Sequence, residues 1–173
     1  MPLILDGTAG MTVPQGAVYN GLQTATAQAS TSGTSIDFIG IPLWVKRITV
    51  MFNVVSTSAT SNIQAQIGSG SVTTSGYLSN FNTFSGSPGG VSATSGFVLA
   101  STVAAATWSG QFQIITLGSN IWVASGVIAR VDATVLSMFG GSITLAGSLD
   151  RVRITTVNGT DTFDAGSINI VYE

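Results

Sequence analysis

The side chains that could do chemistry are few. The carboxylates are Asp6, Asp37, Asp132, Asp150, Asp161, Asp164 and Glu173. A glycosidase places two carboxylates across one glycosidic bond, but no spacing in this sequence pairs any two of them. The chain has no His and no Cys, which removes the commonest general base, thiolate nucleophiles and Cys-based metal sites. We therefore expect a non-enzymatic protein with no catalytic residues and no cofactor, and a carbohydrate-processing enzyme is the weakest alternative.

One acidic stretch has the composition of a cation site. Asp161 and Asp164, with Asn158 nearby, offer the oxygen ligands that Ca²⁺ takes, although their spacing matches no calcium-binding loop. Asx side chains also close turns, and this interpretation is favoured, with calcium left open. The Asn158-Gly159 pair is a strong signal for a β-hairpin.

The cations are equally sparse. Arg151 and Arg153 share one face of a predicted strand, and Lys46 and Arg47 stand at the start of another. In so uncharged a chain we expect these groups to form ion pairs, for example across neighbouring strands.

Composition limits the classes of function. Charged residues make up 7% of the 173, against about 25% in an average soluble protein, and none lies between Arg47 and Arg130. The net charge of −2 provides no basic field for nucleic acid. Low charge also favours association between chains. The start of the chain has no basic region typical of a secretory signal, and the apolar run 97–108 is too short for a membrane helix, so we expect no membrane insertion.

Residues 35–55 organise the chain. A short strand signal breaks at Gly40-Ile41-Pro42 and continues into a long strand. Alternation places one apolar set on a single face, namely Ile48, Val50, Phe52 and Val54. Thr49, Met51 and Asn53 fall on the other face. This period of two is typical of a strand with one buried face.

Further strands follow, with turn signals between them. Residues 118–120 predict a tight hairpin, and nowhere do apolar residues recur at helical spacing; residues 134–139 could form at most a short helical turn. Many strands with such turns indicate an all-β fold, an antiparallel β-sandwich that is jelly-roll-like.

Residues 1–33 differ from the rest, because their strand signals are short and punctuated by Gly. Such strands cannot bury a face alone. We expect an N-terminal arm that serves attachment or trimerisation, with a frayed tail as the alternative, followed by a β-sandwich domain over residues 34–173.

Residues 69–95 are rich in Gly, Ser, Asn and Thr and hold Tyr77, Phe81 and Phe84. Aromatic rings among small polar residues are typical of binding loops, so these three are candidates for a receptor-facing loop. The alternative is that the rings cap the open end of the sandwich.

Trp44, Trp108 and Trp122 could form a sugar-stacking platform. Trp122 lies within a predicted strand and is expected in the core. Trp44 and Trp108 flank turns, and with Met51 they are the candidates for an interface.

Two passages resemble a known family. Residues 36–53 read Ile-Asp-Phe-Ile-Gly-Ile-Pro-Leu-Trp-Val-Lys-Arg-Ile-Thr-Val-Met-Phe-Asn, which resembles a segment that recurs in tail-fibre and virion proteins of tailed bacteriophages and prophages. Residues 149–173 belong to the same pattern, and Leu5-Asp-Gly-Thr-Ala-Gly resembles the start of such proteins. The resemblance covers both ends of the main domain, whereas residues 69–106 match nothing in it.

The resemblance implies a virion structural or host-attachment role without catalytic residues, and a homotrimer. The leading hypothesis is a trimeric tail-fibre or short-fibre component on the phage particle, in contact with other virion proteins through its N-terminal arm and with a host surface glycan or protein. The alternative is a capsid decoration or cement protein that stabilises the phage head.

Overall fold

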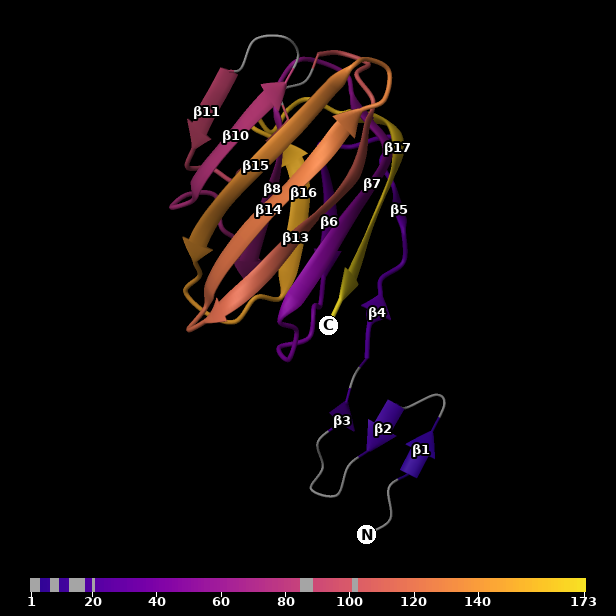
Figure 1. The fold of residues 1–173 in the computed structure, drawn as a ribbon, viewed down its shortest axis with the longest axis vertical. Coiled ribbons are helices and arrows are strands. Elements are labelled where there is room, and N and C mark those ends of the chain that lie inside the picture. The colour runs from indigo at the N-terminus through magenta and orange to yellow at the C-terminus, as the bar shows by residue number, and fades with distance from the viewer. Residues whose placement is uncertain (1–3, 7–9, 13–17, 20, 85–88, 101–102) are drawn as a thin grey trace.

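The computed structural model describes residues 4–6, 10–12, 18–19, 21–84, 89–100 and 103–173. They form two antiparallel sheets packed face to face, with a further small sheet near the N-terminus (Figure 1). The predicted all-β sandwich is therefore confirmed, while the jelly-roll connectivity stays a prediction.

The long sheet forms the front layer in Figure 1 and the short sheet lies behind it. In spatial order, the long sheet consists of β11 (Gly89–Ala93), β10 (Leu78–Phe84), β15 (Val135–Thr144), β14 (Ile121–Arg130), β13 (Trp108–Gly118), β7 (Arg47–Thr57) and β17 (Phe163–Tyr172), with β4 (Gln23–Thr24) and β5 (Gln28–Ala29) along the edge of β17. The short sheet consists of β12 (Phe97–Ala100), β8 (Ile63–Ser69), β16 (Arg151–Thr156) and β6 (Ser35–Ile39), with β9 (Ser71–Val72) paired to β8.

The core lies between the two sheets. Ile48, Val50 and Phe52 of β7 are buried, as the alternation predicts. The Phe52 ring meets Phe112 edge-on at a centroid distance of 5.9 Å, and Phe112 meets Phe139 in the same way at 5.3 Å. Edge-to-face aromatic pairs of this kind stabilise a core beyond the area that they bury.

The predicted face of β7 is wrong at Val54, which is 41% exposed and has a positive φ of 54°. A β-bulge causes the change. Phe52 pairs with Gly110 and Val55 pairs with Trp108, so β7 contains one more residue between the two pairs than β13 does. A bulge reverses the alternation that follows it, and Val55 is buried in place of Val54. The Val54 amide donates to Ser109 Oγ at 2.9 Å.

The two predicted hairpins have opposite outcomes. Ser119 and Asn120 both have positive φ and join the paired strands β13 and β14, so this hairpin is confirmed. The hairpin at Asn158-Gly159 is wrong, because β16 belongs to the short sheet and β17 to the long sheet. Since β16 is already flanked by β6 and β8, the turn carries the chain from one sheet to the other. Residues 135–144 form β15 where the sequence allowed a short helical turn.

The predicted arm divides into two parts. β1 (Ile4–Asp6), β2 (Gly10–Thr12) and β3 (Val18–Tyr19) form an antiparallel sheet of their own. Residues 23–30 instead dock on the sandwich, since the Ala25 amide donates to the Ile170 carbonyl at 2.9 Å and the Ser30 amide to the Gly166 carbonyl at 3.0 Å. The edge of the long sheet therefore begins before residue 34, where the sequence places the boundary.

Candidate functional site

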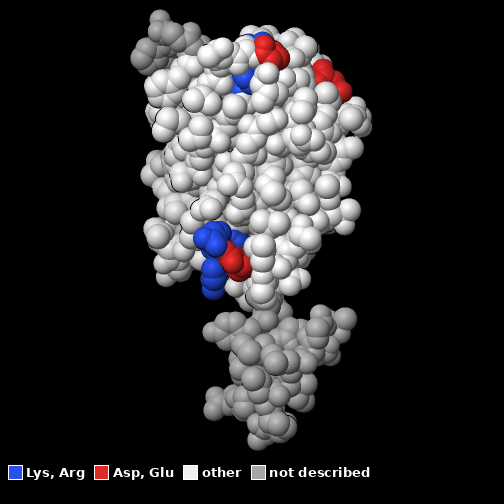
Figure 2. All heavy atoms as spheres, turned by 45° about the vertical axis from the view of Figure 1, so that its right-hand side comes forward, with Lys and Arg blue, Asp and Glu red and all other residues white. Residues whose placement is uncertain are grey.

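Each of the four Arg side chains forms an ion pair. Arg153 and Asp37 stand directly opposite each other on β16 and β6, with Nε and Oδ1 2.7 Å apart, and Arg47 pairs with Glu173. These two pairs confirm the expected pairing across neighbouring strands for Arg153 and Arg47, whereas Lys46 forms no ion pair within the described residues. Arg130–Asp132 and Arg151–Asp150 are pairs within a short stretch of chain, each at 2.7 Å. On the face that Figure 2 shows, charged side chains gather at the two ends of the sandwich, and the surface between them is uncharged.

Ion pairing makes the acids poor proton donors. A hydrogen bond from Arg130 holds the pKa of Asp132 well below its usual range, and a hydrogen bond from Arg151 lowers the pKa of Asp150 in the same way. A general acid works best with a pKa near the operating pH. These two carboxylates are therefore suited to structural pairing.

The predicted calcium ligands serve a turn. Asp161 Oδ2 accepts from the Ser61 amide at 2.9 Å, and Oδ1 accepts from Asn158 Nδ2 at 2.6 Å. Asn158 Oδ1 in turn accepts from the Thr160 amide at 3.0 Å. Asp164 is exposed on β17. Within the described residues, no group of three or more acidic side chains could hold a metal ion. These bonds favour the Asx-turn interpretation.

The predicted receptor-facing residues are not together on the surface. Tyr77 and Phe81 are buried, so their assignment to an outward-facing loop is wrong, and only Phe84 is exposed. Residues 78–84 form β10, whose alternation turns Phe81 toward the core. The Tyr77 ring packs edge-on against Phe97 at 5.0 Å.

The predicted interface residues also separate. Trp108 is fully buried, which corrects its assignment to an interface, because the bulge at Val54 lets it lie over the core opposite Val55. Trp122 is buried as expected. Trp44 is 37% exposed and packs against Tyr172 at a centroid distance of 6.0 Å. Met51 is half-buried on the outer side of the long sheet.

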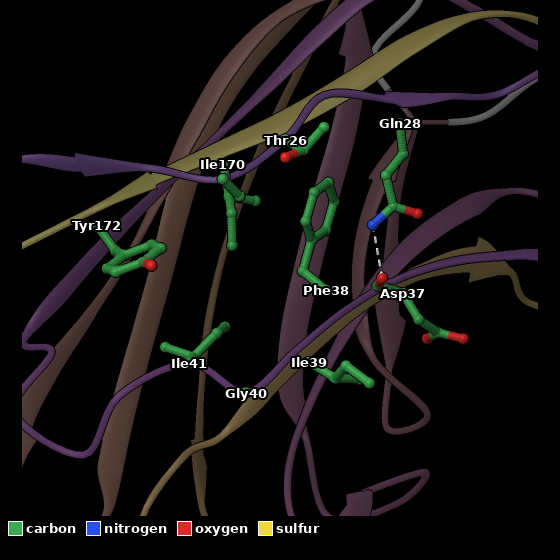
Figure 3. A pocket seen from close by; sticks show the side chains of 10 residues that line it. Thr26, Gln28, Asp37, Phe38, Ile39, Gly40, Ile41, Ile170 and Tyr172 are labelled. Atoms are coloured by element: carbon green, nitrogen blue, oxygen red, sulfur yellow. Dashed lines mark hydrogen bonds between the residues drawn. The ribbon is translucent and has the colours of Figure 1, made fainter.

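A groove lies between β6 and the docked segment 25–28, with a volume of about 260 Å³ (Figure 3). Its lining combines the Tyr172 ring with the polar groups of Thr26, Gln28 and Asp37. Gln28 Nε2 donates to the Asp37 carbonyl at 2.7 Å, which ties the docked segment to the short sheet across the groove. This bond holds the Gln28 side chain at the rim, whereas the Asp37 carboxylate points away from the groove and pairs with Arg153. Sequence reasoning missed the groove, because it forms only when segment 25–28 docks.

A second recess of about 360 Å³ lies over the short sheet, near Arg153 and Thr155. Gln64 and Gln66 are buried at its base. Gln66 Nε2 donates to the Ser95 carbonyl and Ser95 Oγ donates to Gln64 Oε1, each at 2.8 Å. These groups therefore already bond to one another at the base of the recess.

The outer side of the long sheet has a different character. Two neighbouring rows of outward-facing residues cross the sheet without a charge, and we call them together the uncharged face. The first row is Asn169, Met51, Gln111, Val127, Met138 and Asn82, and the second is Val171, Thr49, Gln113, Ser125, Gly140 and Asn80. Val127 and Met138 are direct cross-strand neighbours, and each is nearly half exposed.

Comparisons with known proteins give no identification: no protein-family model, no curated protein and no solved structure matches this chain. Over the part of the chain that the structure describes, no helix has the length and apolar character needed to cross a membrane.

Proposed function

We propose that this chain is a non-enzymatic structural protein on the surface of a bacteriophage particle, a trimeric tail-fibre or short-fibre component that contributes to host attachment. Its N-terminal residues would contact other virion proteins, and the sandwich would be of the jelly-roll type.

The observation that carries the proposal is that the two virion-like segments meet in the fold. Residues 36–53 contribute β6 and most of β7, and residues 149–173 contribute β16 and β17. β6 pairs with β16 in the short sheet, and β7 pairs with β17 in the long sheet. Two sequence segments about a hundred residues apart thus build one unit that runs through both layers. A resemblance confined to one structural unit is better support than two unrelated stretches.

The ion pairs support the same grouping. Asp37 and Arg47 belong to the first segment, whereas Arg153 and Glu173 belong to the second, and each pair joins the two. Exposed pairs contribute only about 0–1 kcal/mol each. Their value here is in fixing register, because a one-residue slip of β16 against β6 would turn Arg153 away from Asp37.

Host attachment needs a surface for a glycan or a protein. The groove in Figure 3 has the Tyr172 ring at one end and the Thr26 hydroxyl and the Gln28 amide along one side, whereas the Asp37 carboxylate points away and pairs with Arg153. An apolar wall with a few fixed polar groups is the usual make-up of a small-ligand site, and an aromatic ring with polar neighbours suits a neutral sugar. We therefore propose the groove beside Tyr172 as the place of glycan contact.

Electron microscopy of intact particles, with an antibody or a fused tag at the C-terminus, tests the proposed role. We expect label on the tail, at fibre positions. Label on the head would replace this proposal with the capsid decoration protein, and particles that never contain the chain would refute a virion role altogether.

A further inference from the structure

The uncharged face carries a contiguous apolar cluster at its centre. Val127 of β14 lies opposite Met138 of β15, and Leu136, directly beside the two rows, lies two residues from Met138 on the same side of that strand. All three side chains are between 45% and 50% exposed. Met51, half-buried, continues the row two strands away, beyond Gln111. Monomeric proteins rarely leave large contiguous apolar patches in water.

The polar groups around this cluster are all amides or hydroxyls. Gln111, Gln113, Asn80, Asn82 and Asn169 carry amides, and Thr49 and Ser125 carry hydroxyls. Amides and hydroxyls both donate and accept hydrogen bonds, so each can pair with an identical group. A charged group cannot do this, because two copies of it repel each other. A face built only from apolar, amide and hydroxyl groups is therefore chemically complementary to itself.

The uncharged face is large enough to form the centre of a stable contact. The long sheet places seven main strands side by side, and the two rows of the uncharged face cross six of them. With about 4.8 Å between strands and about 3.3 Å per residue, these two rows cover roughly 400 Å². A standard protein interface buries about 800 Å² per partner, so the uncharged face has the size of an interface centre, and the rows beside it would form the rim.

We infer that the uncharged face is a self-association surface, on which further copies of this chain pack through the same face. A different protein partner would be expected to use charge for steering and for selection, and this face has no charged group with which to do so. The inference deepens the proposed trimer by naming the surface that holds it together, but it does not depend on the virion role.

Charge substitutions test the inference. Val127→Glu with Met138→Glu places carboxylates at the centre of the face, where copies would bring them together. We expect wild-type protein at micromolar concentration to show several chain masses, three for the proposed trimer, in light scattering, and the double variant to show one. Ile39→Glu is the matched control, because Ile39 is 73% exposed on the outer side of the short sheet, beside Arg151. It should leave the mass unchanged.

A labelling experiment covers the case in which the double variant fails to fold. Because the natural chain has no Cys, Met138→Cys and Ile39→Cys each introduce a single thiol. In assembled protein we expect maleimide to label the thiol at 138 at least ten times more slowly than the thiol at 39. Equal labelling rates in the assembled protein, or a wild-type chain that stays single at micromolar concentration, would overturn the inference. If the charge substitutions dissociate the assembly as expected but the chain is absent from phage particles, the self-association surface is supported and only the proposed virion role is refuted.

Discussion

Removal of one hydroxyl from the core should have a measurable cost. Tyr77 is fully buried, and its hydroxyl oxygen accepts from the Ile67 amide at 2.8 Å. The hydroxyl also lies 3.0 Å from the Thr73 carbonyl, to which it donates. Tyr77→Phe keeps the ring against Phe97 but leaves the Ile67 amide without this acceptor.

The magnitude follows from the unmet amide. A buried donor that loses its partner costs about 1–3 kcal/mol. In a chain of this size each kcal/mol moves the melting temperature by about 2–4 °C. We therefore expect Tyr77→Phe to lower the melting temperature by about 2–12 °C, whereas Tyr172→Phe, at a half-buried position on the rim of the groove, should shift it less.

The pH dependence provides a second signature of the same hydroxyl. Burial raises the pKa of Tyr77 to about 12, whereas an unfolded chain ionises its Tyr side chains near pH 10. The stabilisation from Tyr77 is therefore complete below about pH 10 and is lost as pH rises toward 12, because the unfolded state ionises first. Urea unfolding of wild type and Tyr77→Phe should show a difference in free energy that is constant at neutral pH and shrinks above pH 10. Equal stability of the two proteins at pH 7 would show that the amide is satisfied in another way.

Three further predictions concern the edge strand, the bulge and the core. Deletion of residues 1–20 should leave the melting temperature within about 2 °C of wild type. Deletion of residues 1–33 should lower it by about 5 °C or more, because it also removes β4 and β5, which pair with β17. Equal melting temperatures for the two truncated proteins would show that β4 and β5 add no stability. Gly166→Ala should lower the free energy of unfolding in urea by about 1–3 kcal/mol, because Gly166 has a φ of +93° and a Cβ there would lie 2.3 Å from the Val54 carbonyl oxygen. An unchanged unfolding midpoint would contradict the geometry of the bulge at Val54. Phe81→Ala should cost about 3–5 kcal/mol, and the exposed Leu43→Ala should change stability by about 0.5 kcal/mol or less; similar costs would place Phe81 outside the core.

Strands with a clear alternation could be predicted from the sequence, and the bulge within one of them could not. Ile48, Val50 and Phe52 repeat with a period of two, which is a local property. The reversal at Val54 depends on Gly166 and Gly110 in the flanking strands, both with positive φ. These partners are more than fifty residues away in sequence. No local pattern contains that information.

The burial of Tyr77 and Phe81 could not be predicted from the sequence for a related reason. The inward positions of β10 are Ser79, Phe81 and Thr83, so only one of the three is a large apolar residue and the alternation is weak. Their burial comes from β12, which packs over this part of the long sheet: the Val98 amide donates to Ser79 Oγ at 3.2 Å. Contact with β12 therefore buries one side of β10, although most residues of β10 are polar. The groove beside Tyr172 was missed in the same way, since two distant segments build it.

The long uncharged stretch of sequence acquires a spatial meaning in the fold. Between Arg47 and Arg130 the chain has no charge, and this stretch supplies nearly all of β7, β10, β13 and β14, which with β15 make up the middle of the long sheet. The ion pairs are formed by residues outside it. A water-facing sheet normally alternates apolar with charged and polar residues, so two neighbouring outward-facing rows that cross six strands without a charged residue need their own explanation. Contact with identical copies provides one, because identical charges would oppose each other there, whereas the amides, hydroxyls and apolar side chains of the uncharged face can meet their own kind.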